Sequence, residues 1–196
     1  GDMQLALAFC TLANAGLEYM RVMSAAVGAD WKLRDRLFIG LEGFYKQFLD
    51  IPLSVATGVP LTCLGADYGS IGEELLVSDA SGRSYGVELL VRWLIPDKIT
   101  LVGSATLYKS EFKSGKDAGY VPSAWDNRFI TNLSAVYELP RYWSIGAKVS
   151  AIGGAPYTPF DEEASSLKQY WDSAGRPVYD YGKYNQERLD PYCQLD

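Results

Sequence analysis

The chain contains no histidine and only three cysteines, at positions 10, 63 and 193. Without histidine, haem sites, most zinc sites and the Ser–His and Cys–His catalytic pairs lose their usual ligands and bases. The cysteines show no metal-binding spacing. Cys63 could pair with another cysteine in an oxidising compartment, or the three could be small unpaired residues. We therefore expect neither an enzyme nor a bound cofactor.

Long apolar runs and basic clusters are also missing. No run reaches the roughly 18 to 20 apolar residues that a membrane helix needs, and the longest charge-free stretch, residues 51–66, is interrupted by Pro52, Gly58 and Pro60. Residues 3–17 lack charge too, but no basic segment precedes them, so they do not indicate a signal peptide. The net charge is −6 and Lys and Arg are scattered, which excludes a nucleic-acid partner.

What the sequence does contain is a period of two. Six segments place mainly apolar residues at odd positions and a mixture of Gly, Ser, Thr and charged residues at even positions. These segments are residues 25–33, 37–46, 84–95, 99–108, 131–139 and 143–150. The pattern predicts six strands, each with one apolar face and one mixed face that suits a wet lumen.

The connections between these segments alternate in length. Polar turns at 34–35, 96–98 and 140–141 are very short, whereas the Gly-, Pro- and Tyr-rich excursions span residues 49–83, 112–125 and 155–190. Transmembrane β-barrels have this layout, with short periplasmic turns and long external loops. We therefore predict an all-β fold of about six to eight antiparallel up-and-down strands belonging to a transmembrane β-barrel.

Aromatic residues mark both ends of the apolar face. Near the short turns lie Trp31, Trp93, Trp143 and Tyr137. Toward the long excursions lie Tyr45 and Tyr85. A bilayer places amphipathic rings at both interfaces. A half-buried antiparallel sheet in a soluble protein alternates as well, so a soluble, aromatic-rich β-sandwich that binds carbohydrate is the alternative prediction.

Two sets of side chains are candidates for function. The first set shares the even, lumen-facing parity and comprises Glu42, Lys46, Glu88, Arg92 and Lys148. The second set comprises aromatic residues on the predicted connections, where recognition residues normally lie, namely Trp125, Tyr157, Trp171 and Tyr179. Packing within the loops is an equally good explanation for the second set.

Acidic residues offer two further hypotheses. The runs Glu73–Glu74 and 161–163 are expected to be solvated loop charges, with a divalent-cation site as the lesser alternative. A glycoside hydrolase would need two carboxylates at a set separation, and Asp126 and Glu163 are available, but nothing in their spacing selects them. Asp126 and Arg128 have the same parity and form a candidate stabilising pair.

Three motifs resemble the C-terminal barrel strands of TonB-dependent outer-membrane receptors, especially the Bacteroidetes type. They are residues 82–88 and 124–129, each entering a strand, and residues 153–161, which leave one. The resemblance covers roughly residues 20–196. It implies a gated importer of iron chelates, vitamins or glycans in the cell outer membrane, driven by the TonB complex through a plug domain that this chain lacks. Its partners would be outer-membrane lipids and a surface lipoprotein.

The same resemblance suggests how the chain is divided. Residues 1–19 are expected to form an N-terminal loop segment, in which Gly1 is interpreted as a cloning remnant, and residues 20–196 a partial outer-membrane barrel. Such a segment of a larger wall has unpaired strand edges, which predict self-association. The transported substrate does not follow from the sequence.

Overall fold

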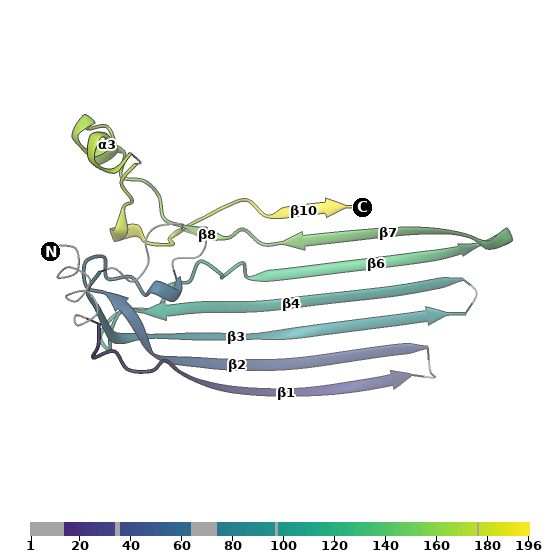
Figure 1. Ribbon diagram of the computed structural model, residues 1–196. Coiled ribbons are helices and arrows are strands. Elements are labelled where there is room, and N and C mark those ends of the chain that lie inside the picture. Colours follow the sequence, from purple (N-terminus) through teal and green to yellow (C-terminus); the bar gives the residue numbers. More distant parts are fainter. Residues whose placement is uncertain (1–13, 34–35, 64–73, 97, 176) are drawn as a thin grey trace, which may run out of the picture.

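The computed structural model describes residues 14–33, 36–63, 74–96, 98–175 and 177–196. Its main element is one antiparallel sheet in which consecutive long strands lie side by side (Figure 1). The strands along this sheet, in spatial order, are β1 (Arg21–Leu33), β2 (Leu37–Ser54), β3 (Leu76–Ile95), β4 (Ile99–Lys113), β6 (Phe129–Leu139), β7 (Trp143–Ile152) and β10 (Tyr192–Leu195). The predicted all-β, up-and-down arrangement is confirmed.

Short elements occupy the connections. β5 (Val121–Pro122) pairs with β4, and β8 (Pro156–Tyr157) pairs with β9 (Glu187–Arg188) in a second, two-stranded sheet. The helical elements are η1 (Leu61–Cys63), η2 (Pro140–Tyr142), α2 (Glu162–Ser165), α3 (Lys168–Ala174) and η3 (Tyr181–Lys183). Within the described ranges, no helix is long and apolar enough to cross a membrane.

The unequal connections lie at opposite ends of the sheet, as predicted. Figure 1 shows that β1, β3 and β6 end at one end of the sheet, and that the described parts of the long connections, including α3, lie at the other. At the β6–β7 turn, Arg141 and Tyr142 both adopt positive φ angles of 65° and 63°. Two positive φ values in succession match the twist of the flanking strands, which accounts for so tight a reversal.

The period of two continues across the sheet. At each pairing of the long strands, odd residues lie opposite odd residues and even opposite even, as far as the irregularity that follows Phe48. Ala29 lies opposite Leu41, for example, and Leu41 opposite Leu89. The odd residues of all seven strands therefore share one face, which we call the apolar face, and the even residues share the other, the mixed face.

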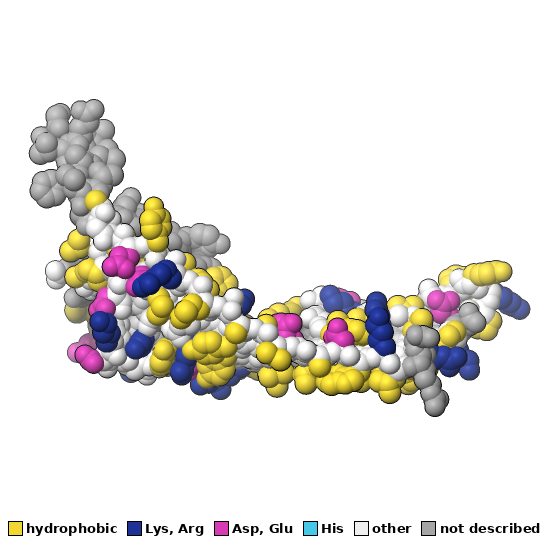
Figure 2. Space-filling view, turned by 90° about the horizontal axis from the view of Figure 1, so that it is seen from below, with side chains coloured by type: hydrophobic (Ala, Val, Ile, Leu, Met, Phe, Trp, Pro, Cys, Tyr) yellow, Lys and Arg dark blue, Asp and Glu magenta, His cyan; other side chains and the backbone are white. Residues whose placement is uncertain are grey.

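The apolar face has no covering layer in the described chain. Val27 is 81% exposed, Leu107 63% and Trp143 71%. In Figure 2, hydrophobic side chains gather along one side of the strand region, whereas its charged side chains project mainly from the other. A single-layer sheet of this kind cannot derive its stability from a core beneath the strands, because most of its large apolar side chains remain exposed.

The buried core lies instead at the end with the long connections. The pairing of β2 with β3 shifts register between Phe48 and Ile51, where Asp50 has a φ of 57°. Beyond this irregularity Ile51 and Leu53 pack with Ala80, and all three are buried. A bulge redirects the strand, so odd residues beyond it no longer belong to the apolar face.

This end also differs from the expected loop boundaries. The sequence pattern predicts a loop over residues 49–83, yet β2 extends to Ser54 and β3 already begins at Leu76. Of the expected N-terminal loop, residues 1–19, the first thirteen residues lie outside the described part of the chain. In the described remainder, the Asn14 side chain donates to the carbonyl oxygen of Glu74 (3.0 Å) and accepts from the Leu76 amide (3.0 Å), so it lies against the start of β3.

Candidate functional site

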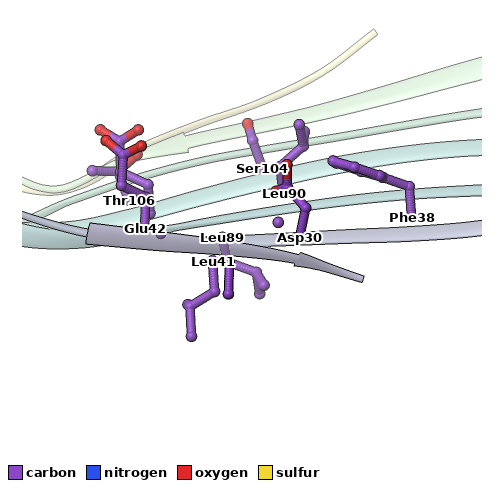
Figure 3. A pocket seen from close by; sticks show the side chains of 12 residues that line it. Asp30, Phe38, Leu41, Glu42, Leu89, Leu90, Ser104 and Thr106 are labelled. Atoms are coloured by element: carbon purple, nitrogen blue, oxygen red, sulfur yellow. The ribbon is translucent and has the colours of Figure 1, made fainter. Parts of the chain in front are cut away.

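The mixed face is hollowed near the middle of the sheet. A hollow of about 680 Å³ lies over β1 to β4. Figure 3 shows Asp30, Glu42, Ser104 and Thr106 projecting from the sheet on one side, and Leu41 and Leu89 on the opposite side. The carboxylates and hydroxyls therefore line a polar surface, while the adjacent leucines belong to the apolar face.

The five predicted lumen-facing residues all belong to the mixed face. Glu42 lies directly opposite Glu88 in the β2–β3 register, and both line the hollow together with Asp30. Carboxylates placed directly opposite one another are unfavourable, so this part of the face carries a local negative field. Arg92 lies toward the short turns with its guanidinium 5.7 Å from the centroid of the Phe38 ring. Lys46 and Lys148 lie elsewhere on this face, outside the hollow.

The mixed face is less polar than the sequence pattern indicates. Leu90, Leu94, Val102 and Val136 project from it and are 36% to 45% exposed. They lie from mid-sheet toward the short turns, beside Arg92. The face therefore combines an acidic, hydroxyl-rich hollow with an apolar patch, rather than a uniformly wet surface.

The apolar face has a defined height. On β3, Trp93 and Tyr85 are eight residues apart, which at about 3.3 Å per residue corresponds to about 26 Å along the strand. Strands of outer-membrane barrels are tilted by about 35–45°, so this length corresponds to a height of about 20 Å, which is of the order of the 25 Å apolar band between the two aromatic girdles of such barrels. Tyr85 and Tyr45 stack at the boundary nearer the long connections, with ring centroids 6.4 Å apart.

Charged side chains begin directly beyond this boundary. Arg83, the next outward residue of β3 on the same face, donates to Glu111 on β4 at 2.8 Å. Lys109 donates to the same carboxylate at 3.0 Å, and the Arg83 guanidinium lies 3.8 Å from the Tyr120 ring centroid. The change from apolar to charged side chains coincides with the aromatic pair, as expected where a lipid interior gives way to water.

Three of the four predicted ligand contacts lie in the excursion between β7 and β10. Tyr157 is on β8 and donates to Glu187 at 2.5 Å, and this hydrogen bond raises the pKa of its hydroxyl. Trp171 is on α3 and donates to the carbonyl oxygen of Ser165 at 2.6 Å. Tyr179 stacks on Phe160. Trp125 is 59% exposed and lies in the separate connection before β6. The structure therefore does not bring the four together.

It does bring together a row of rings that the sequence pattern does not reveal. Phe160, Tyr179, Tyr181, Tyr184 and Phe112 make successive ring contacts, and we call this row the aromatic ladder. The available signal is the spacing of three tyrosines within six residues, at 179, 181 and 184. Two of the rings, Phe112 and Phe160, come from distant parts of the chain, so spacing alone could not show the whole row.

The base of the same excursion is fixed to the sheet by a buried ion pair. Asp126 is 1% exposed and accepts hydrogen bonds from the Arg188 guanidinium and from the Ser110 amide (2.9 Å). Arg188 also donates to the carbonyl oxygen of Gly154 at 3.1 Å. The expected partner Arg128 is 60% exposed, with its Nε 4.0 Å from the carboxylate. The main partner of Asp126 is therefore Arg188, and this engagement makes Asp126 a structural carboxylate.

Backbone contacts explain three of the four glycines in the sequence motifs. A Cβ atom at Gly154 would overlap the carbonyl oxygen of Leu189, and one at Gly153 would overlap that of Asn127. At Gly86 a Cβ atom would overlap the carbonyl oxygen of Leu107 on β4. These positions need glycine because two backbones approach closely there.

The acidic runs have structural roles in the described residues. Asp161 is the N-cap of α2, where its carboxylate accepts from the Ala164 amide at 2.9 Å, and Glu162 and Glu163 occupy the first turn. Carboxylates at these positions stabilise a helix start. The described part of the chain contains no group of three Cys, Asp or Glu side chains arranged to hold a metal. Glu73 lies outside the described residues.

The two described cysteines are unpaired. Cys63 is buried in η1, and burial raises the pKa of its thiol to about 11. Cys193 is exposed on β10, and Cys10 lies outside the described residues. A disulfide between Cys63 and Cys193 is therefore absent.

Comparison with known proteins shows the class of fold. No protein-family model and no curated protein matches the chain by sequence. Among solved structures, its neighbours are β-barrel receptors, and the sheet corresponds to part of a barrel wall.

Two of these neighbours are an import receptor for a ferric catecholate and an iron transporter. The ferric-catecholate import receptor Fiu of Escherichia coli K12 is similar with a TM-score of 0.58 and 16% identity, over 90% of this chain and 20% of that protein. The FrpB iron transporter of Neisseria meningitidis is similar with a TM-score of 0.57 and 12% identity, over 92% of this chain and 24% of that protein. The chain spans about a fifth to a quarter of the length of these structures. At identities of 16% and 12%, the structural likeness shows the fold alone.

Proposed function

We propose that this chain forms part of the barrel wall of a TonB-dependent outer-membrane receptor that imports a scarce nutrient. The observation that carries the proposal is the exposed apolar face, which continues across seven strands and is bounded by aromatic residues. Its height, about 20 Å for tilted strands, is of the order of the apolar band of outer-membrane barrels. In this arrangement the apolar face contacts lipid, the mixed face lines the lumen, and the long connections form the external rim.

In this arrangement the predicted lumen-facing residues occupy different levels of the barrel lumen. Glu42 and Glu88 lie in the wall of the hollow, and Arg92 lies closer to the periplasmic end, beside the apolar patch of the mixed face. A lumen filled only with water would not favour the part of that patch outside the hollow, Leu94, Val102 and Val136, whereas a plug packed inside the barrel would cover this part. Energy coupling would reach the receptor through such a plug, and a surface lipoprotein would meet the external rim.

A soluble carbohydrate-binding sandwich fits the structure less well. A sandwich needs a second sheet against the apolar face, and the described residues form one large sheet and one two-stranded sheet. In isolation the chain would also expose an open edge, because β1 pairs only with β2 among the described strands. We therefore expect the isolated chain to self-associate or to require detergent.

The orientation can be tested by labelling intact cells that express the full-length protein. In a background in which the native cysteines are replaced by serine, Asp172→Cys on α3 should react with a membrane-impermeant maleimide from outside. Lys98→Cys, at a short turn, should react only after the outer membrane is permeabilised. Equal labelling of both positions on intact cells would refute the proposal.

A further inference from the structure

A second hollow, of about 560 Å³, opens on the apolar face over β1, β2 and β3. At its centre Gly43 of β2 lies between Val27 of β1 and Val87 of β3 in the register of the sheet. A Cβ atom at Gly43 would meet no atom closer than 4.0 Å, so the missing side chain leaves open space there. Tyr45 and Tyr85 line the end of the hollow that is nearer the long connections.

The width of this hollow suits one hydrocarbon chain. Val27 and Val87 are separated by two strand spacings, which corresponds to about 10 Å between their backbones. Apolar carbon atoms pack about 4 Å apart, so a methylene chain that touches atoms on both sides needs about 8 Å. A chain laid over Gly43 would therefore contact both valines.

A cationic cluster adjoins the outer end of the hollow. Arg83, which also lines the hollow, donates through Nε and Nη2 to one oxygen of Glu111, at 3.0 and 2.8 Å. Lys109 donates to the other oxygen at 3.0 Å. Two cations share one carboxylate here, so one positive charge is left over. Further outward on the same two strands, Lys113 and Asp79 carry opposite charges and do not change this balance.

The cluster keeps donors for a further anion. Within the described residues the second terminal nitrogen of the Arg83 guanidinium, Nη1, makes no hydrogen bond, and Lys109 is half exposed. The guanidinium is held between two rings, with its carbon 3.8 Å from the Tyr120 centroid and 5.5 Å from the Tyr85 centroid. A cation that is already fixed in place loses little conformational entropy when it binds an anion.

The cluster lies at the level of lipid headgroups. Arg83 is two residues beyond Tyr85 on β3, which corresponds to about 7 Å along the strand and about 5 Å of height for a tilted strand. Each headgroup layer of a bilayer is about 5–7 Å deep. The guanidinium therefore lies at the depth of lipid phosphates, while the hollow lies at the depth of acyl chains.

We propose that the hollow and the cluster together form a binding site for one anionic membrane lipid, with an acyl chain over Gly43 and the phosphate at Arg83 and Lys109. Guanidinium and ammonium groups are common partners of phosphate oxygens, and basic side chains at a membrane surface attract anionic lipids. The inference rests on the proposed function, because it requires the apolar face to meet lipid. It goes beyond general lipid contact by assigning a single site and the charge of the headgroup.

The test is native mass spectrometry of the full-length protein in detergent, titrated with dioleoyl phosphatidic acid or with dioleoyl phosphatidylcholine. We expect one phosphatidic acid to bind per protein, at least tenfold more tightly than phosphatidylcholine. Arg83→Gln removes the phosphate contact and Gly43→Val fills the hollow, and each should weaken this binding tenfold or more.

Two control variants match these changes. Arg36→Gln removes an exposed positive charge at the short-turn end of the sheet, and Gly103→Val adds the same side chain to the apolar face of β4, outside the hollow. Both should bind phosphatidic acid as the parent does. The urea midpoints of Arg83→Gln and Gly43→Val should equal those of their controls, which separates loss of the site from loss of the fold.

The source of the phosphate is decided by two competitors. A large excess of inorganic phosphate, or of dihexanoyl phosphatidic acid with its short chains, should not displace the long-chain lipid. The proposal is overturned if either competitor displaces it fully, if both long-chain lipids bind equally, or if Arg83→Gln and Gly43→Val bind like the parent. Surface labelling of Asp172→Cys on intact cells reports the receptor orientation independently, so failure of the lipid site is distinguished from failure of the proposed function.

Discussion

Leu89 and Leu90 provide a matched test of the two faces. They are consecutive residues of β3 with similar exposure, 39% and 44%, but their side chains project from opposite faces. Leu89 lies midway between Tyr85 and Trp93, at the centre of the apolar band. An arginine at the bilayer midplane costs a transmembrane barrel about 2–4 kcal/mol. We therefore expect Leu89→Arg to lower the free energy of unfolding by about that amount.

The Leu90→Arg variant should behave differently. Leu90 lines the hollow that also contains Asp30, Glu42 and Glu88, so an arginine there would remain hydrated and would find carboxylates nearby. We expect this variant to cost less than about 1 kcal/mol, as is usual for solvent-accessible positions. Burial cannot account for such a difference, because the two leucines are about equally exposed in the protein itself.

The assay is urea unfolding of the full-length protein reconstituted in phospholipid vesicles, followed by tryptophan fluorescence. The parent and the two variants should give the same slope against urea, so that a shifted midpoint reports stability rather than a change in compactness. Equal destabilisation by Leu89→Arg and Leu90→Arg would refute the assignment of lipid and lumen to the two faces.

Three further predictions concern the end with the long connections. Asp126→Ala should destabilise the protein by about 3 kcal/mol, because it leaves a partly buried guanidinium unpaired, and should make residues 155–190 sensitive to limited proteolysis. Arg128→Ala is its control and should have little effect in the same assay. Gly154→Ala should lower the urea midpoint through its backbone clash, whereas Gly119→Ala, which meets no atom within 4 Å, should not. Cys63, with its thiol pKa raised to about 11, should resist iodoacetamide at pH 8 until the protein is unfolded, as read by peptide mass mapping; rapid native labelling would contradict its burial.

Much of the sheet could be predicted because alternation is a local property of a strand. Each side chain points away from its neighbours in sequence, so parity alone assigns Val27, Leu41 and Val87 to one face. Short polar turns then preserve that parity from one strand to the next. For the same reason the shared face of Glu42, Lys46, Glu88, Arg92 and Lys148 follows from their even numbers in the sequence.

The boundaries of the long connections could not be read in this way. The irregularity after Phe48 breaks the alternation and produces apolar residues at both parities, so Ile51 and Ala80 resemble loop residues in sequence although they form a buried core. The helices within residues 155–190 are short, and capping by Asp161 leaves only a weak signal in a segment with many turn residues.

The sequence by itself therefore determined the strand order, the two faces and the unequal ends, because these depend on residues close together in the chain. Only the tertiary structure decided the partner of Asp126 and the members of the aromatic ladder. Arg188 lies 62 residues after Asp126, and Phe112 is on β4 whereas Tyr184 lies in the connection between β7 and β10. Such pairs form because the folded backbone brings distant segments together, and no periodicity in the chain records that proximity.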